Sequence, residues 1–313
     1  LAPFGQRALR VVAGAALAWA ACLNPPPAQA AGQHHGLLMW IGQYGSAERN
    51  LPGIALDAER ARLMASALGV PDSLRRELSD EQLTLRGMAD ALESLERRVA
   101  PGDRVFIYFS GHGKQIDGGR FGARCSEGLV TRDGALYLDV AIEYTLQRLA
   151  TKATVVMMND SCHSGGAATK RYAAPLAGEP DDEVPKAYPG PVSAVGGRKG
   201  SGDEAGGCGA AVNKGVDLAR GLSAATQGTG RWLYIAAARA DEAAFATPRG
   251  SRATQAWQAC LNSPEADADR DGHVSGEELR ACAQRQIDAA GRGRQTITLL
   301  GDAGLPVLVR PRR

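Results

Sequence analysis

The sequence predicts an α/β fold with a mostly parallel central sheet and helices on both faces. Short, unbroken apolar runs rich in β-formers indicate strands buried on both faces, and they lie at Leu37 to Ile41, Val105 to Phe109, Thr154 to Met158 and Trp232 to Ala238. Helical patterns alternate with these runs, as in chains that build parallel sheets by crossover connections. The hydrophobic content of 44% over 313 residues is enough for a buried core.

Three amphipathic helices are expected between the first strands. The second is preceded by Ser79 and Gln82 at the spacing of a capping box, so we expect this pair to start it. The apolar faces are Ala61, Met64, Ala65 and Leu68 in the first helix, Leu85, Met88, Leu92, Leu95 and Val99 in the second, and Ile142, Leu146 and Leu149 in the third.

Residues 1–30 have the pattern of a secretory signal peptide. Arg7 and Arg10 precede an apolar run from Val11 to Leu23, and Ala28-Gln29-Ala30 fits a cleavage site. An uncleaved anchor or lipidation at Cys22 stays open as an alternative. We therefore expect an exported chain, periplasmic or secreted, without a stable membrane span, and we expect His34-His35 to lie in a tail at the new amino terminus.

Charge and cysteine content narrow the possible functions. Removal of residues 1–30 takes away two Arg and no acid, which leaves 34 basic and 34 acidic residues, so nucleic acid is a poor candidate partner. Export leaves Cys125, Cys162, Cys208, Cys260 and Cys282, an odd number that predicts one free thiol in an oxidising compartment. No C-x-x-C pair supports a structural zinc site.

A Gly/Pro-rich stretch separates the third strand from the fourth. Residues 165–231 carry five prolines and three Gly-Gly pairs, and a stretch of this length without a periodic pattern is either functional or disordered. We expect a flexible loop. It also holds basic residues that an Arg/Lys-directed peptidase could cut: Lys170, Arg171, Lys186, Arg198 and Lys199.

Two strands end in residues suited to nucleophilic catalysis. Val105 to Phe109 leads into Ser110-Gly111-His112-Gly113, and Val155 to Met158 leads into Asn159-Asp160-Ser161-Cys162-His163. Ligands bind at the carboxyl edge of open α/β sheets, so His112 and Cys162 could face one substrate bond. A thiol attacks as thiolate, and an imidazole can take its proton. The alternative is a buried packing cysteine and a structural histidine.

These paired motifs resemble the metacaspase branch of the caspase-like cysteine peptidases, from about Leu37 to Val309. The resemblance implies a caspase-like three-layer sandwich in which residues 31–164 correspond to the large subunit, 165–231 to a loop where the family cuts itself, and 232–313 to the small subunit. It makes His112 the general base or its ion-pair partner and Cys162 the nucleophile. It also assigns the oxyanion-hole amides to Gly113 and Cys162.

The resemblance further implies a pocket for a basic side chain. Asp160 matches one acid that metacaspases place there, and the segment from Leu51 to Asp57 resembles another family motif, which makes Asp57 the second acid and Ser110 a polar wall. Ile54 departs from the usual Cys. Two partly desolvated carboxylates would favour Arg or Lys and disfavour Asp. The alternative for Asp57 is a helix N-terminal acid stabilised by the dipole.

A twelve-residue segment, 267–278, fits an EF-hand calcium loop. Acids stand at positions one, three and five, a Gly at the sixth, a Ser at the ninth and a Glu at the twelfth. The candidate ligands are Asp267, Asp269, Asp271, His273, Ser275 and Glu278. The alternative is a capped turn in which Ser275 starts a helix. Many metacaspases are activated at a separate calcium site, for which this sequence offers only Glu127, Asp133 and Asp139. Its match to that activating site is therefore weaker than the match of residues 267–278 to an EF-hand loop.

Four cysteines are candidates for disulfides if Cys162 stays free. Cys260 and Cys282 flank the EF-hand-like loop, whereas Cys125 and Cys208 follow the His and Cys strands. Four cysteines allow three pairings, so the connectivity stays open, and so does the reduced state.

The sequence thus predicts a cysteine endopeptidase that cleaves after Arg or Lys through a Cys162 thioester, acting on protein or peptide substrates. No cofactor is required for this chemistry, and Ca²⁺ is possible. By analogy with metacaspases we expect a monomer. The competing interpretation is a catalytically inactive, calcium-dependent binding or scaffold protein of the cell envelope. A related peptidase with another pocket preference is a further alternative.

Overall fold

A computed structural model describes residues 32–117, 125–162, 183–192, 231–239, 242–290 and 294–310. The described ranges leave out the predicted signal peptide and Cys208. Of the candidate cut sites, Lys186 is described, whereas four lie outside these ranges: Lys170, Arg171, Arg198 and Lys199. None of the helices in the described ranges combines the length and the apolar character that crossing a bilayer requires.

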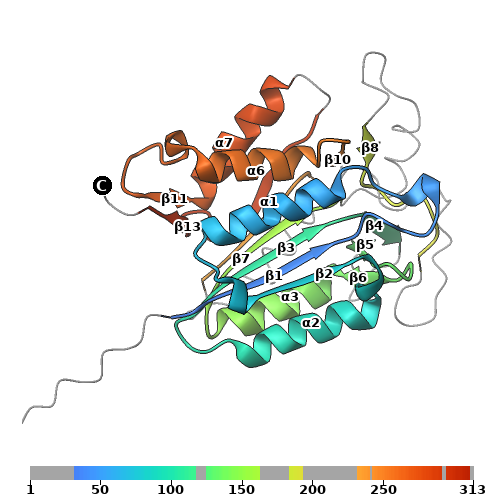
Figure 1. Cartoon of the computed structure of the whole chain (residues 1–313), viewed down its shortest axis with the longest axis horizontal. Helices are drawn as coiled ribbons and strands as arrows, with labels where there is room; N and C mark the ends of the chain where they lie inside the picture. The colour runs from blue at the N-terminus through green and yellow to red at the C-terminus, as the bar shows by residue number, and fades with distance from the viewer. Residues whose placement is uncertain are drawn as a thin grey trace, which may run out of the picture. The chain divides into compact units, whose positions relative to one another are not determined.

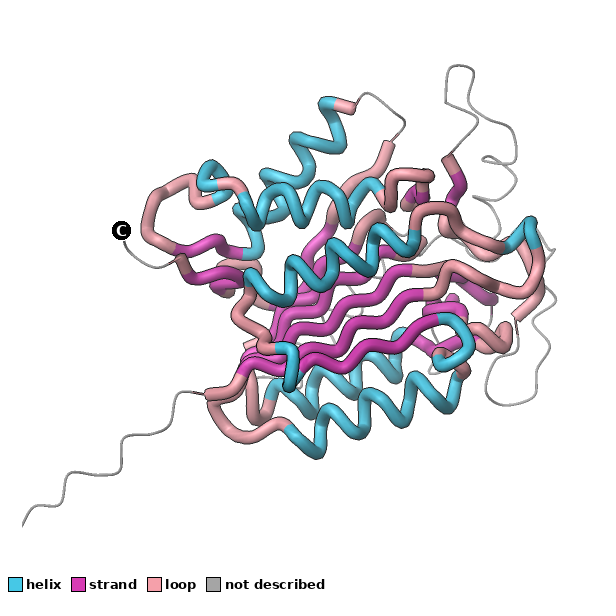
Figure 2. The backbone as a smooth tube through the Cα atoms, viewed as in Figure 1, coloured by secondary structure: helices cyan, strands magenta, loops and turns pink. Residues whose placement is uncertain are grey.

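The centre of the structure is a six-stranded sheet in the order β12-β9-β7-β3-β1-β2. All neighbours are parallel except β12, which runs antiparallel to β9. The strands of this sheet appear as a magenta layer between cyan helices in Figure 2. The strands are β1 (His34–Trp40), β2 (Arg75–Ser79), β3 (Arg104–Ser110), β7 (Thr154–Asp160), β9 (Trp232–Ala236) and β12 (Thr298–Gly301). The four strands predicted from apolar runs are therefore confirmed, while the edge strands β2 and β12 carry too few apolar residues to be recognised that way.

Helices cover both faces of this sheet (Figure 1). One face packs on α2 (Leu85–Arg98) and α3 (Asp139–Ala150), and the other on α1 (Ile54–Ala67), α6 (Arg252–Asn262) and α7 (Gly276–Ala289). Strand side chains alternate between the two layers: Leu37 and Met39 join the α2/α3 core, and Leu38 joins the core under α1. The predicted three-layer α/β sandwich is confirmed.

Smaller sheets of two or three strands accompany the central sheet. They are β4 (Gly113–Asp117), β5 (Cys125–Val130) and β6 (Leu136–Leu138) in one sheet, β8 (Val184–Pro185) with β10 (Phe245–Ala246), and β11 (His273–Ser275) with β13 (Pro306–Val309). The β8–β10 pair shows that residues 183–192, inside the stretch expected to be a flexible loop, dock on the domain.

Two local predictions were wrong. Ser79 and Gln82 do form a capping box, but it closes the 3₁₀ turn Asp80–Gln82, and the side chain of Thr84 caps α2 by accepting from the Gly87 N–H. His34 and His35 do not lie in a tail. They are the first two residues of β1, which pairs with β3. Within this pairing His35 is buried, and its Nε2 lies 3.0 Å from a carboxylate oxygen of Asp103.

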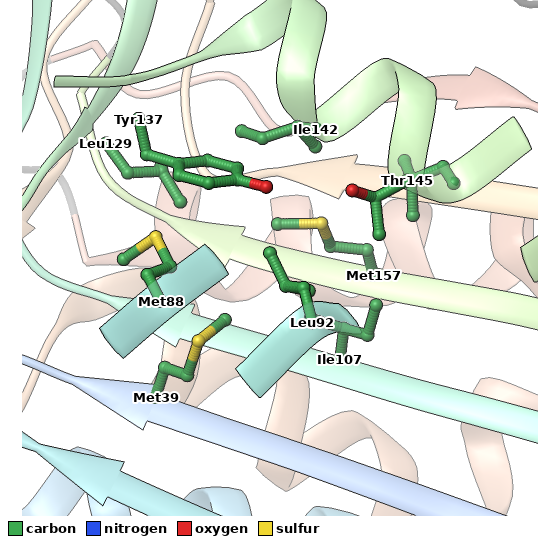
Figure 3. Close-up of a pocket in the computed structure, with 10 residues that line it drawn as sticks. Met39, Met88, Leu92, Ile107, Leu129, Tyr137, Ile142, Thr145 and Met157 are labelled. Atoms are coloured by element: carbon green, nitrogen blue, oxygen red, sulfur yellow. The ribbon is translucent and has the colours of Figure 1, made fainter. Parts of the chain in front are cut away.

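The apolar layer between the sheet and α2/α3 contains a void of about 10 Å³ (Figure 3). Apolar side chains such as Met39, Met88, Ile107 and Met157 line it, with the Tyr137 and Thr145 hydroxyls at its edge. A space of this size holds no more than about one water molecule. We therefore place no ligand site in this layer.

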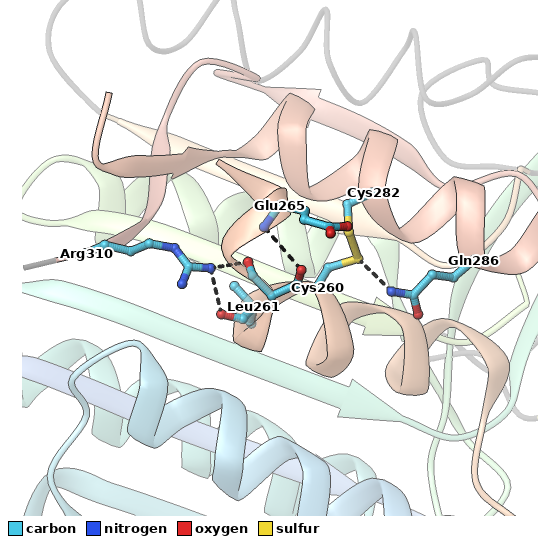
Figure 4. The surroundings of a disulfide bond; sticks show 7 residues. Cys260, Leu261, Glu265, Cys282, Gln286 and Arg310 are labelled. Carbon is cyan, nitrogen blue, oxygen red and sulfur yellow. Dashed lines mark hydrogen bonds between the residues drawn. A yellow bond between two sulfur atoms is a disulfide. The ribbon is translucent and has the colours of Figure 1, made fainter. Parts of the chain in front are cut away.

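A disulfide joins Cys260 in α6 to Cys282 in α7 (Figure 4). The Gln286 side-chain amide lies 3.2 Å from the Cys260 sulfur, and Arg310 donates to the Leu261 carbonyl oxygen at 3.2 Å. The two helices that flank the EF-hand-like loop are thus held together by a covalent bond. Cys125 is the first residue of β5, the middle strand of the sheet formed by β4, β5 and β6.

Candidate active site

His112 and Cys162 follow the adjacent parallel strands β3 and β7, whose last residues, Ser110 and Asp160, are paired in register. Both side chains are buried, with exposures of 1% and 0%. A methyl group on Gly113 would lie only 1.7 Å from the Cys162 carbonyl oxygen, so the backbones after the two strands are in close contact. Parallel pairing therefore brings the predicted base and nucleophile to one edge of the sheet.

The imidazole of His112 is held in one orientation. Its Nε2 atom lies 2.8 Å from the Arg49 carbonyl oxygen, which can only accept, so Nε2 carries the proton. The Tyr44 ring packs 4.7 Å from the imidazole, and the Tyr44 hydroxyl accepts from the His112 backbone N–H at 2.8 Å. Nδ1 is buried without a hydrogen-bond partner in the described part of the chain.

Burial lowers the pKa of His112 to about 4, although a backbone hydrogen bond with Arg49 opposes this shift. At neutral pH the ring is therefore uncharged, and its unprotonated nitrogen is Nδ1. A neutral imidazole with a free lone pair is the form that can accept a proton from a thiol.

The Cys162 sulfur is contacted by the backbone of Ala244, the residue before β10. The Ala244 N–H donates to Sγ at 3.0 Å, and Sγ lies 3.3 Å from the Ala244 carbonyl oxygen. An N–H directed at sulfur stabilises the thiolate relative to the thiol. Among the cysteines with described side chains, Cys162 is the one that takes no part in a disulfide.

The two predicted pocket acids converge with Ser110. Asp57 in α1 accepts from the Ser110 hydroxyl at 2.8 Å and from the Ser251 N–H at 2.7 Å. Asp160 accepts from the Thr254 N–H at 3.0 Å and the Thr254 hydroxyl at 2.6 Å. Asp57 does lie in the first turn of α1, but its buried carboxylate is directed toward these partners, which shows that it is more than a dipole-stabilising acid.

Lys186 occupies the space between these acids. Its Nζ atom lies 2.8 Å from Oδ1 of Asp160 and 3.8 Å from Oδ2 of Asp57, and it donates to the Ser110 hydroxyl at 2.9 Å. All three charged side chains are 0% exposed. Burial raises the pKa of Asp57, and the Lys186 ammonium counteracts that shift. The cluster thus holds one ammonium group between two carboxylates, all of them shielded from solvent.

The backbone of Lys186 is bound as firmly as its side chain. Its N–H donates to the Ala244 carbonyl oxygen at 2.9 Å, and its carbonyl oxygen accepts from the Gly113 N–H at 2.9 Å. On its amino-terminal side, Val184 and Pro185 pair antiparallel with β10. On its carboxyl-terminal side, the Tyr188 N–H donates to the Gly113 carbonyl oxygen at 3.1 Å. Residues 184–188 thus cross the sheet edge as an extended peptide.

The EF-hand-like loop lies away from the sheet edge, between α6 and α7. One carboxylate oxygen from each of Asp267, Asp269 and Asp271 falls within 4.8 Å of the others. Glu278 accepts from the Ser275 and Ala268 N–H groups, and it forms a capping box with Ser275 at the start of α7. The predicted calcium acids and the alternative capped turn therefore coexist. His273 and Ser275 belong to β11.

The acids considered for a second calcium site have other partners. Glu127 accepts from Gln115 at 3.0 Å, Asp133 accepts from the Leu85 N–H at 3.1 Å, and Asp139 begins α3. Within the described ranges these three do not form a cluster of metal-ligand atoms.

Sequence reasoning missed several residues of this region. Lys186 was recognised only as one of several basic loop residues, and no pattern singled it out. Ser251 and Thr254 stand at the start of a recognisable helix, so their capacity to hold acids could have been anticipated from that position. Tyr44 and Ala244 carry no motif, and only the folded arrangement identifies them.

Comparisons with known proteins identify the family and the fold. The sequence matches the family model described as Caspase domain over residues 33–290. Protein GSU0716 from Geobacter sulfurreducens has a similar structure, with a TM-score of 0.58 and 16% identity over 89% of this chain and 98% of that chain. Caspase-1 from Spodoptera frugiperda gives a TM-score of 0.52 and 10% identity over 87% of each chain.

The search of the curated proteins gave no match. The structural neighbours are too distant in sequence to show more than the fold, but the family match extends from the start of β1 to the end of α7 and includes both motif strands. This chain belongs to the caspase-domain family of cysteine peptidases.

Proposed function

We propose that this chain is a cysteine endopeptidase that cleaves after Lys or Arg and that its own Lys186–Ala187 bond is the first substrate. One observation carries the proposal: Lys186 has its ammonium at Asp160 and its carbonyl oxygen on the Gly113 N–H. This is how a substrate residue before the scissile bond would be held, with its charge neutralised and its carbonyl group polarised.

The chemistry follows from the groups around that carbonyl. His112 Nδ1 removes the proton of the Cys162 thiol, and the thiolate attacks the Lys186 carbonyl carbon. The resulting oxyanion is stabilised by the Gly113 N–H and, by the resemblance, by the Cys162 N–H. As the C–N bond breaks, His112 returns the proton to the Ala187 nitrogen. Water then hydrolyses the thioester, again with His112 as base.

The pocket supports selectivity for a cation. Two carboxylates at full burial are costly when unpaired, and a neutral or acidic side chain would leave them so. Lys reaches Asp160 directly at 2.8 Å, and the planar guanidinium of Arg suits paired carboxylates. Cleavage after Asp would place a third negative charge beside Asp57 and Asp160, so we expect it to be negligible.

Export and calcium binding are further parts of the proposal. The signal-peptide pattern supports a periplasmic or secreted enzyme. The clustered carboxylates of Asp267, Asp269 and Asp271 support a Ca²⁺ site, which Asp267 Oδ1, buried and without a hydrogen-bond partner among the described residues, would help to complete. No metal takes part in the thiol chemistry, and the monomeric state is inferred from the metacaspase resemblance.

A specific observation also favours the scaffold alternative. Lys186 and Cys162 are both completely buried, so in the intact chain the segment that contains Lys186 fills the pocket and the thiol is closed to solvent. If this segment never leaves, the Lys186 ion pairs would be structural and the protein would be an inactive caspase fold.

Hydrolysis of matched fluorogenic peptides ending in Lys, Arg and Asp separates the two functions. Purified residues 31–313 would be assayed with and without Ca²⁺ under reducing conditions, beside Cys162→Ala. Turnover of Lys and Arg peptides that the variant lacks supports the peptidase. Absence of turnover of every peptide, together with an intact chain on N-terminal sequencing, supports the scaffold. Cleavage after Asp would retain the nucleophile and refute the pocket assignment.

A further inference from the structure

The segment that carries Lys186 makes a second charged contact, three residues earlier. Arg252 donates from Nε to Oε1 of Glu183 at 3.1 Å and from Nη2 to Oε2, so the guanidinium grips the carboxylate with two parallel bonds. The side chains are only 7% and 2% exposed. A buried, bidentate pair of this kind is both strong and geometrically selective.

Arg252 belongs to the rigid part of the site. It is the first residue of α6, next to Ser251, which binds Asp57, and two positions before Thr254, which binds Asp160. Its guanidinium carbon also lies 4.5 Å from the centre of the Phe245 ring in β10, the strand that pairs with Val184 and Pro185. The helix that supports the basic-residue pocket therefore also fixes Arg252.

Glu183, in contrast, belongs to the bound peptide. It precedes β8 and leads directly into Val184, Pro185 and Lys186. A cavity of about 300 Å³ adjoins the pair, and Arg249 lines it beside Arg252 and Glu183. The peptide-binding edge thus carries acids at one end, around Lys186, and arginines at the other. An extended peptide spans this separation with three residues, on the order of 10 Å.

We infer that Arg252 is a specificity-determining residue that binds a carboxylate on the fourth substrate residue before the cut. The preferred substrates are then peptides with Glu three residues ahead of Lys or Arg, as in Glu183-Val184-Pro185-Lys186. This inference rests on the proposed peptidase function. It adds a preference for an acidic residue three positions before the Lys or Arg. The acidic pocket alone cannot impose this preference, because that pocket contacts only the side chain of the residue at the cut.

The test uses processed enzyme, checked by N-terminal sequencing, and three coumarin-amide peptides: Glu-Val-Pro-Lys, Gln-Val-Pro-Lys and Val-Pro-Lys. We expect the Gln peptide to have a kcat/KM about 10-fold to 100-fold lower than the Glu peptide, as for loss of a charged, desolvated hydrogen-bonded pair. In Arg252→Gln this ratio should fall to near one. Arg252→Glu, which is assayed with Lys-Val-Pro-Lys as an additional peptide, should instead favour that peptide over Glu-Val-Pro-Lys.

The outcomes distinguish this inference from the proposed function. Cleavage of all three peptides by the parent at equal kcat/KM would overturn the acidic subsite and leave the peptidase intact, whereas cleavage of none would remove the peptidase itself. Val-Pro-Lys has no residue that could contact Arg252. If Arg252 were only structural, Arg252→Gln would lower the turnover of Val-Pro-Lys and of Glu-Val-Pro-Lys by the same factor. Exposed Glu265→Gln serves as the matched control for expression and processing.

Discussion

The ammonium of Lys186 lies 2.8 Å from the carboxylate of Asp160, and neither side chain is exposed to solvent. Lys186 comes from a Gly/Pro-rich stretch and Asp160 from the end of a central strand, so the chain places one of its own basic residues in the pocket that its sequence predicts for a substrate. The intact chain is therefore the first system in which the proposed specificity can be tested.

Replacement of Lys186 should change self-cleavage at one bond. The parent should yield a fragment that begins at Ala187, and Lys186→Arg should yield it too, since a guanidinium satisfies the same acids. Lys186→Gln should slow this cut by at least about 100-fold, because two buried carboxylates lose their counterion. Timed N-terminal sequencing measures the cut. Cys162→Ala is the control that must stay intact, and equal cutting of Lys186→Gln would refute the assignment.

Asp160→Asn should abolish the pocket's preference for a cation. Removal of one partner of a buried ion pair costs about 3 kcal/mol or more, which corresponds to a loss of at least about 100-fold in kcat/KM for Lys and Arg peptides. Asp103→Asn is a matched control, since it removes another buried Asp, located at the opposite end of the sheet beside His35. A comparable loss in both variants would mean that only folding had been affected.

The low pKa of His112 predicts a loss of stability in mild acid. The pKa of His112 is about 4 in the folded chain, whereas an unperturbed histidine, as in the unfolded chain, has a pKa of 6.5. The unfolded chain therefore binds the proton more readily. The contribution of neutral His112 to the free energy of unfolding is fully present above pH 6.5 and is lost as the pH falls toward 4. Between pH 7.5 and pH 5 it amounts to about 2 kcal/mol.

Urea unfolding of Cys162→Ala, with and without His112→Asn, measures this term. The free energy of unfolding should fall by about 2 kcal/mol less in the double variant over that pH range, because the other titrating groups cancel. Parallel pH profiles for the two proteins would show that burial does not depress the pKa of His112.

The disulfide between Cys260 and Cys282 should stabilise the region around α6. The residues are 22 positions apart, and closing a loop of that length in the unfolded chain corresponds to about 3 kcal/mol. Cys260→Ser with Cys282→Ser should lower the free energy of unfolding by about this amount. Cys125→Ser with Cys208→Ser tests the other candidate pair independently. An unchanged stability after loss of Cys260 and Cys282 would contradict the prediction.

Calcium binding at residues 267–278 can be measured directly by calorimetry. We expect one Ca²⁺ per chain, with binding lost in Asp267→Asn combined with Asp269→Asn, because these variants remove two of three clustered carboxylates. Asp90→Asn, an exposed acid on α2, is the control. No heat of binding in the parent would favour the capped turn that Ser275 and Glu278 already form.

The sequence predicted the central sheet well because each buried strand leaves a local record. Runs such as Val105 to Phe109 are apolar on both faces, and the residues that follow them, His112 and Cys162, must then share an edge if the strands are parallel neighbours. The edge strand β2 was missed for the converse reason. The strand Arg75–Ser79 is largely polar, and it is recognised only through its pairing with β1.

By itself, then, the sequence determined the fold class and the two motif strands, and it predicted a pair of pocket acids at Asp57 and Asp160. Only the tertiary structure decided which basic residue those acids hold, which carbonyl group orients His112 and which arginine meets Glu183. The physical reason is that strand and helix periodicity is a property of neighbouring residues. A buried ion pair, in contrast, depends on where a loop without periodicity returns to the domain, and no local pattern records that position.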